Sequence, residues 1–225
     1  MDNKKNEGAY FSAFSKSRKN LARLTPQDIA RSALCEYDGP RMCFYLKSFN
    51  HSFQISYPEG KISFLDSNNK PPLEWGLILL NYLSGAKDIP LAGKWVSYRE
   101  LPDGNVFFPS IKTHVLDVLS KYYTTCNKDL LRERLVHLGF NPEKNKADLS
   151  AEGLFTPRIP IKIQFWEGED VIPPSCQILF DSSISCHMHI EDIAALCSVI
   201  RDLLINADFS LSGRKCVHLE DDEGR

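Results

Sequence analysis

The chain has 225 residues, 43% of them hydrophobic, and a formal net charge of −2. It is therefore long and apolar enough to bury a core, and too nearly neutral to attract nucleic acid through its overall charge. No segment approaches the roughly 20 apolar residues of a membrane span, and the first residues lack the apolar core of a secretory signal, which predicts a cytoplasmic protein. Seven cysteines without any C-x-x-C spacing favour buried free thiols over disulfides or metal ligands.

The N-terminal segment, residues 1–24, is basic and partly aromatic. One interpretation is a basic amphipathic arm for nucleic acid or a membrane surface. The other is a solvated helix that packs Phe11, Phe14 and Leu21 and exposes its Lys and Arg side chains, and this is the one we expect.

Thr25 followed by Pro26 is typical of a helix start, with Thr25 as the N-cap and Pro26 at the first helical position. We place the beginning of the main domain at this start. The chain then divides into the basic helix or arm at 1–24, one domain at 25–206 and a flexible polar tail at 207–225.

Residues 41–66 alternate apolar and polar side chains with a period of two. Three short strands fit this pattern, with the sequence Pro58-Glu59-Gly60 as the turn between the last two. The expected arrangement is an antiparallel meander. Residues 73–84 are apolar on nearly every side, which predicts a buried central helix that is too short to cross a bilayer.

The middle of the chain is mostly helical in pattern. Residues 93–101 fit a strand or extended segment, and residues 107–123 and 127–138 fit two amphipathic helices. Polar residues dominate 141–152, where we expect a surface connection.

Residues 158–206 form a core-building unit of two strands and a helix. Residues 159–165 alternate as a half-buried strand does, residues 178–180 fit a second strand, and residues 190–205 place apolar side chains on one helical face. We predict an α+β fold in which a single compact domain has an antiparallel or mixed β-sheet covered by helices, chiefly those at 73–84 and 190–205.

Cys186, His187 and His189 form the best candidate for a metal site. In an extended segment the two histidines lie on the same side, and thiolate and imidazole donors together suit zinc or another transition metal. A surface loop before a capped helix explains the same residues without a metal.

An acidic loop offers a second candidate. Glu167, Glu169 and Asp170 lie beside Trp166 and fit an acid/base pair, a cation site or an ordinary solvated loop. The chain has no glycine-rich phosphate loop, no G-x-S-x-G elbow and no metalloprotease helix motif. No catalytic residue is assigned, and the pattern favours a protein that is not an enzyme.

Five segments carry a resemblance to a known family. In chain order they are LILLNYLSGA (77–86), GKWVSYREL (93–101), PIKIQFWEGED (160–170), ILFDSSI (178–184) and EDIAAL (191–196). Their order resembles an uncharacterised family, a domain of unknown function of anaerobic bacteria and archaea, associated with corrinoid methyl-transfer and iron–sulfur proteins. The resemblance implies a cytoplasmic accessory protein that binds a corrinoid (cobalamin) or a related tetrapyrrole, with corrinoid methyltransferases or iron–sulfur proteins as partners.

The chain lacks the D-x-H-x-x-G loop of familiar cobalamin-binding methyltransferases, so a corrinoid requires a different pocket. The resemblance and the clustered aromatics suggest one in which His187 or His189 reaches the metal. The residues of this hypothetical pocket are Trp75, Trp95, Tyr98, Arg99, Trp166, His187 and His189. Two alternatives stay open: an interaction partner of corrinoid or iron–sulfur enzymes without a cofactor, and a metal-dependent enzyme that uses Cys186, His187 and His189.

Overall fold

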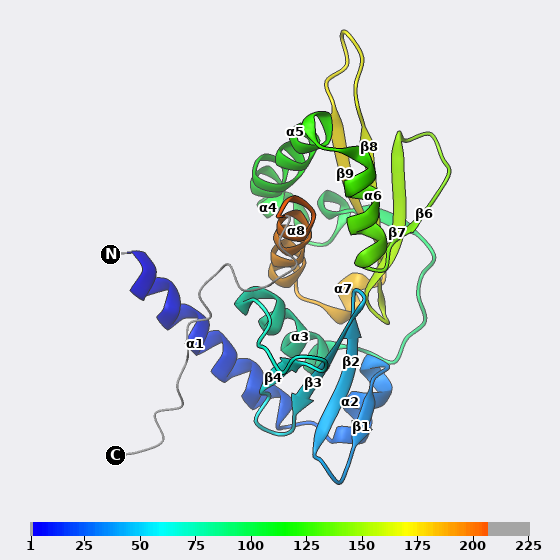
Figure 1. Ribbon diagram of the computed structural model, residues 1–225. Coiled ribbons are helices and arrows are strands. Elements are labelled where there is room, and N and C mark those ends of the chain that lie inside the picture. Colours follow the sequence, from blue (N-terminus) through cyan, green and yellow to red (C-terminus); the bar gives the residue numbers. More distant parts are fainter. Residues whose placement is uncertain (1, 207–225) are drawn as a thin grey trace.

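The computed structural model describes residues 2–206, with side chains from Tyr10 onward, and it contains two antiparallel sheets joined by helices (Figure 1). One end of the molecule holds the first sheet with the first three helices, and the other end holds the second sheet with most of the remaining helices. The predicted α+β class and single compact domain are confirmed, and the sheet is divided in two. The predicted polar tail at 207–225 lies outside the described residues.

The first sheet is a meander in which each strand pairs antiparallel with the next one along the chain. Its strands are β1 (Glu36–Asp38), β2 (Cys43–Ser48), β3 (His51–Ser56) and β4 (Ile62–Phe64). The three strands expected within 41–66 are therefore confirmed. β1 was not predicted, because three residues are too few for a periodic pattern and the strand forms by pairing with β2.

The central helix α3 (Leu73–Gly85) covers the first sheet (Figure 1). Its Trp75 and Tyr82 side chains are fully buried, and the Trp75 ring lies 5.3 Å from the Phe53 ring on β3. The Trp75 indole nitrogen donates a hydrogen bond of 2.9 Å to the Ser48 hydroxyl, which satisfies its one polar atom. The apolar run predicted as a buried helix is thus the centre of this core.

The basic N-terminal segment forms α1 (Asp2–Leu21), which packs along α3. The Ser17 hydroxyl donates to the Asn81 side chain across this contact at 2.5 Å. Phe14 and Leu21 are buried as predicted, but the prediction for Phe11 is wrong, because its side chain lies off the packed face and is 59% exposed.

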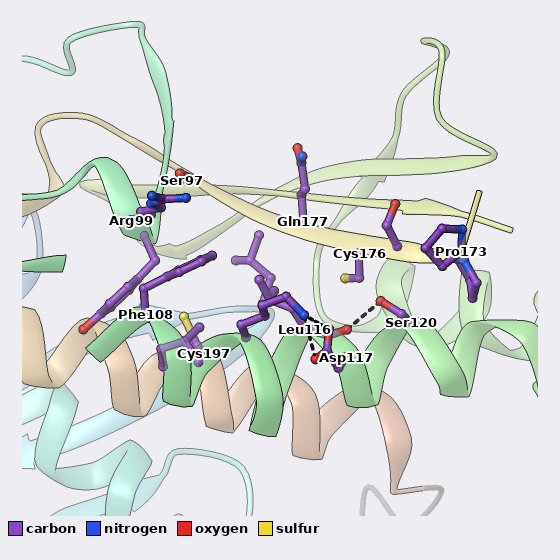
Figure 2. Close-up of a pocket in the computed structure, with 16 residues that line it drawn as sticks. Ser97, Arg99, Phe108, Leu116, Asp117, Ser120, Pro173, Cys176, Gln177 and Cys197 are labelled. Atoms are coloured by element: carbon purple, nitrogen blue, oxygen red, sulfur yellow. Dashed lines mark hydrogen bonds and ion pairs between the residues drawn. The ribbon is translucent and has the colours of Figure 1, made fainter. Parts of the chain in front are cut away.

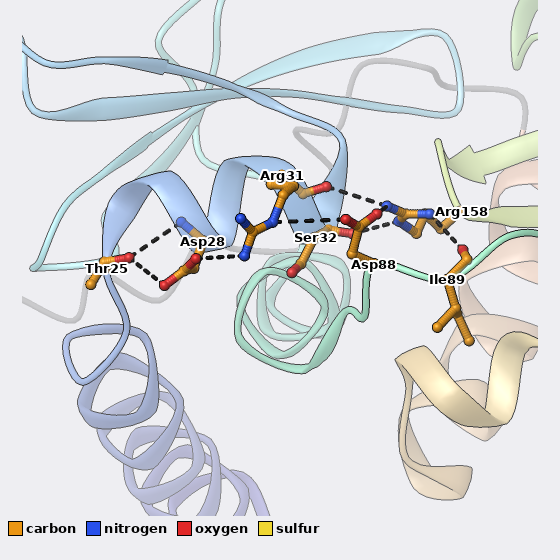
Figure 3. Close-up of polar contacts among 7 residues, drawn as sticks. All are labelled: Thr25, Asp28, Arg31, Ser32, Asp88, Ile89 and Arg158. Atoms are coloured by element: carbon orange, nitrogen blue, oxygen red, sulfur yellow. Dashed lines mark hydrogen bonds and ion pairs between the residues drawn. The ribbon is translucent and has the colours of Figure 1, made fainter.

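The second helix, α2 (Pro26–Ala33), begins as the sequence predicts. The Thr25 hydroxyl accepts a hydrogen bond from the Asp28 amide at 3.3 Å, which makes Thr25 the N-cap. From there a chain of ion pairs runs from Asp28 to Arg31 and on to Asp88, in the segment after α3 (Figure 3).

Arg158 ties three separate segments together at the end of that chain (Figure 3). Its buried guanidinium donates to the Ser32 carbonyl at 2.5 Å and to the Ile89 carbonyl at 2.6 Å, and it pairs with Asp88 at 2.6 Å. Five fixed donors on one side chain suit a junction where several carbonyls converge. We call this group of contacts the Arg158 clamp.

The second sheet has the strand order β5-β9-β8-β7-β6, antiparallel throughout. Its strands are β5 (Trp95–Ser97), β6 (Asn141–Pro142), β7 (Leu149–Thr156), β8 (Ile159–Trp166) and β9 (Ser175–Asp181). The predicted pair β8 and β9 is confirmed. The surface connection predicted at 141–152 is wrong over its second half, where β7 begins. Ser150, Glu152 and Gly153 weaken the alternation of β7, and the strand is fixed by its pairing with β8.

Helices cover the inner face of the second sheet (Figure 1). They are α4 (Gly104–Ile111), a π-helical turn η2 (Lys112–Leu116), α5 (Asp117–Thr125), α6 (Lys128–His137) and α8 (Ile190–Ile205). α8 has the predicted bounds, and the two amphipathic helices predicted before it are confirmed in position. The first of them is interrupted by the π turn, which follows Pro109, a residue without a backbone donor.

Candidate functional site

A pocket of about 530 Å³ lies between the second sheet and its covering helices (Figure 2). Its walls come from the short helix η1 (Tyr98–Glu100), from α4, η2 and α5 on one side, and from β9 and α8 on the others. This volume is within the roughly 300–1,000 Å³ of small-molecule sites. The pocket is therefore the candidate functional site of the described chain.

Small side chains on facing elements leave this space open. Cys176 on β9, Ser120 on α5 and Cys197 on α8 all line the pocket. Figure 2 shows Cys176 pointing from its strand toward the helices. Larger side chains at these positions would fill the gap between sheet and helix, as they do elsewhere in protein interiors.

Arg99 is one of three charged residues that line the pocket, with Lys112 and Asp117. Its guanidinium carbon lies 5.7 Å from the centre of the Phe108 ring, and its Nε atom donates to the Asn105 side chain at 3.3 Å. Two contacts thus orient an otherwise exposed side chain over an aromatic wall. The remaining guanidinium donors suit a carboxylate or another acceptor on a ligand.

The titratable groups deeper in the pocket are uncharged at neutral pH. Burial raises the pKa of the Cys197 thiol to about 12 and raises that of Cys176 as well. Burial also raises the pKa of Tyr98 to about 12, and its hydroxyl donates to the Ile190 carbonyl at 3.1 Å. Protonated thiols are poor nucleophiles, so these groups form a soft apolar floor suited to binding rather than to covalent chemistry.

The π turn forms part of the helical wall. Lys112, at its start, pairs with Asp117 across the turn at 2.9 Å, and the Ser120 hydroxyl donates to the Leu116 carbonyl at 2.7 Å. Single π turns within α-helices occur frequently at functional sites, because they displace side chains from the regular helical positions. Here the turn lies where Lys112 and Leu116 line the pocket.

Of the predicted aromatic residues, the structure brings Tyr98 to the pocket, together with the adjacent Arg99. Trp166 follows Phe165, whose ring stacks on Tyr123 of α5 at 4.7 Å, so strand alternation turns Trp166 to the outer face of the sheet. The same alternation applies to Trp95, whose neighbour in β5 is buried.

Trp95 and Trp75 each have contacts away from the pocket. The Lys162 ammonium lies 5.0 Å from the Trp95 ring, and Lys162 also pairs with Glu143 and Glu152 on the outer face. Trp75 is buried against the first sheet. The structure therefore does not gather the tryptophans of the hypothetical pocket around Tyr98.

Cys186 and His187 lie in a short helix, α7 (Ile184–His187), where an extended segment was expected, and His189 follows this helix. The helix turns His187 inward, where it is 1% exposed, while His189 caps α8 and its side chain is 70% exposed. Cys186 is exposed. Among the described residues, no group of three or more His, Cys, Asp and Glu side chains is placed to hold a metal ion.

His187 occupies a tight polar environment next to the Arg158 clamp. Its Nδ1 atom accepts a hydrogen bond from the Lys87 amide at 3.2 Å, which leaves the proton on Nε2, an atom buried without a partner. Burial and then the charge of Arg158 lower the pKa of His187, while Asp181 acts in the opposite direction. His187 is accordingly a neutral residue of the interior and is not among the residues that line the pocket.

Several pocket residues were not identified from the sequence, among them Phe108, Leu116 and Cys197. Pro109 inside a predicted helix was the available signal, because a proline there marks an irregular turn. The position of Cys197 at the pocket has no sequence signal, because it depends on how α8 packs against the rest of the fold.

The sequence profile of a domain of unknown function, DUF3786, matches residues 25–202. The chain belongs to this family. The DUF3786 match runs from the cap of α2 into the last turns of α8 and so contains every residue that lines the pocket.

No curated protein and no solved structure matches the DUF3786 chain. Within residues 2–206, none of the helices combines the length and the apolar character needed to cross a membrane.

Proposed function

We propose that this DUF3786 protein is a non-catalytic cytoplasmic accessory protein that holds an organic cofactor in the pocket between α4, η2 and β9. The observation that carries the proposal is the pocket itself, with an arginine held over an aromatic wall and a floor of protonated thiols. Apolar walls with a few placed polar groups are typical of cofactor sites. The ligand we propose to test first is a corrinoid or a related tetrapyrrole, and the proposed partners are corrinoid methyltransferases or iron–sulfur proteins.

The residues of the pocket fit part of such a ligand. Phe108 and the neighbouring aliphatic side chains suit the flat face of a macrocycle, and Arg99 suits an acidic or amide group at its edge. The metal of a corrinoid could also be bound by a histidine side chain of the protein. Neither His187, which is buried, nor His189 is among the residues that line the pocket, although His189 directly precedes Ile190, whose carbonyl accepts from Tyr98. The proposal therefore assigns no metal ligand to His187.

Anaerobic titration of the purified protein with hydroxocobalamin, followed by absorption, tests the proposal. We expect a saturable shift of the corrinoid bands, and binding about tenfold weaker for Arg99→Gln, which corresponds to about 1.4 kcal/mol. Arg132→Gln is the matched control, because Arg132 forms an exposed ion pair with Asp129 on α6 and does not line the pocket.

Each other outcome assigns the function differently. A titration without any spectral shift rules out a corrinoid ligand. If Arg99→Gln binds with unchanged affinity, the ligand binds elsewhere than in this pocket. Metal content is measured on the same sample. Stoichiometric zinc or iron that is lost in His189→Ala would favour the metal-dependent enzyme that uses Cys186, His187 and His189.

A further inference from the structure

The hairpin that joins β8 and β9 projects beyond the helices that cover the second sheet (Figure 1). We define the hairpin tip as residues 168–173. Glu169 and Ile172 exchange two backbone hydrogen bonds of 2.9 Å, so Asp170 and Val171 occupy a tight two-residue turn. Gly168 has a φ of +83° that permits the chain to enter this turn. The tip is thus a hydrogen-bonded turn with a defined shape.

Glu167, at the base of the hairpin, is bound both to the segment before β7 and to α6. The Glu167 amide donates to the Asp148 carboxylate at 2.8 Å, and the Glu167 carboxylate pairs with Lys128 at 3.4 Å. The Lys128 ammonium in turn lies 3.5 Å from the centre of the Tyr123 ring on α5. These contacts fix the hairpin at the end of β8 and so hold the tip in one orientation. Little conformational entropy is then lost when a partner binds the tip.

The tip exposes two adjacent aliphatic side chains. Val171 is 92% exposed and Ile172 is 60% exposed, and both are followed by Pro173, which is also exposed. Single exposed apolar residues are common on protein surfaces and need no explanation. A contiguous pair at the end of a braced hairpin is different, because it can enter a cleft that a flat surface cannot reach.

The charges around this pair restrict the kind of partner. Glu169 and Asp170 flank the aliphatic side chains, and no ion pair to either carboxylate is found among the described residues. Carboxylates at this density repel the phosphates of nucleic acids and of anionic membranes. They are also not placed, in the described structure, to hold a metal ion. A protein surface with basic side chains complements them.

We propose that the hairpin tip is a docking surface for a protein partner with an apolar cleft rimmed by lysine or arginine. The aliphatic pair fills the cleft, and the flanking carboxylates pair with the basic rim. Pro173 also lines the pocket described above, so a partner seated on the tip lies beside the pocket. The inference rests on the tip alone and stands whether or not the pocket binds a corrinoid.

Photocrosslinking from the tip tests the proposal. p-Benzoylphenylalanine replaces Val171 in the full-length chain expressed in its native host, and the matched control carries it at Val106, which is 72% exposed on α4. We expect a cross-linked protein from Val171 and none from Val106. The captured protein is then purified, and its Kd is measured for the native chain and for two double variants. One double variant carries Val171→Asp and Ile172→Asp, and the other carries Glu169→Lys and Asp170→Lys.

The proposal requires both pairs of substitutions to weaken binding by at least about tenfold, and added salt to slow association with the native chain. Circular dichroism and thermal unfolding should match the native chain, because the substituted side chains are exposed. The proposal would be overturned by equal cross-linking from the two sites or by no cross-link at all. Cross-links to lipid, to nucleic acid or to a second copy of this chain would also overturn it. So would a captured partner that binds all variants equally.

Discussion

The two ends of the molecule fill their cores in different ways. At the first sheet, the Trp75 ring makes edge contacts with the Phe49 and Phe53 rings at 5.6 and 5.3 Å, and large side chains close the space between strand and helix. At the second sheet, Cys176 on β9 and Cys197 on α8 both line a pocket of about 530 Å³. Both cores contain buried strands and apolar helices, so the size of a few facing side chains separates a closed core from a binding site.

The closed core should be the most sensitive to truncation. Leu79 on α3 is fully buried, so Leu79→Ala removes buried surface and leaves a cavity. We expect a loss of about 3–5 kcal/mol in the free energy of unfolding, measured by urea denaturation. A loss below about 1 kcal/mol would show that the first core is as loosely filled as the second.

The Arg158 clamp joins the two ends, and its removal should cost somewhat less. Arg158→Met preserves much of the aliphatic stem but leaves the Ser32 and Ile89 carbonyls without their charged donor. We expect a loss of about 2–4 kcal/mol. Arg132→Met, which breaks an exposed ion pair, is the control and should change stability by at most about 0.5 kcal/mol. Equal effects of the two substitutions would show that the clamp is dispensable.

The wall of the pocket should tolerate truncation. Leu116 is only partly buried and borders open space, so Leu116→Ala adds to an existing pocket and creates no new cavity. We expect a loss of about 1 kcal/mol, well below that of Leu79→Ala, in the same denaturation assay. If the two losses agree within error, the pocket is closed in solution.

The smallest effect concerns pH. Because burial lowers the pKa of His187 in the folded protein, the unfolded chain takes up its proton first as pH falls below the ordinary histidine value of about 6.5. Stability is therefore lost from about pH 6.5 down to the lower folded pKa. His187→Asn keeps an acceptor for the Lys87 amide and should flatten this slope, measured by thermal unfolding between pH 5 and 7.5. His189→Asn, at an exposed position, is the control and should retain the slope.

Much of the fold follows from local pattern. The strands at 41–66, the apolar helix α3, the cap at Thr25 and the unit of β8, β9 and α8 all have periodic side chains or specific terminal residues. β7 has no such pattern, because Ser150, Glu152 and Gly153 interrupt the alternation of apolar and polar side chains that would indicate a strand. Its position is a property of its pairing with β8.

The site was predictable only in part. Tyr98 and Arg99 were identified because they are adjacent in a short aromatic segment, and both line the pocket. Strand alternation already separates Trp166 from the buried Phe165, and that argument would have excluded the tryptophan from the inner face. The histidines were misplaced because a four-residue helix, α7, has too few residues for a periodic pattern.

The Arg158 clamp has a consequence for the order of folding. Its partners Ser32, Asp88 and Ile89 lie 126, 70 and 69 residues from Arg158 in the sequence. Closing loops of that length is entropically costly, so each sheet can form its hairpins before the clamp assembles. Interactions formed after the transition state affect the unfolding rate more than the folding rate. Arg158→Met should therefore accelerate unfolding in stopped-flow experiments and leave the refolding rate nearly unchanged, which makes the clamp a determinant of how long the native protein persists.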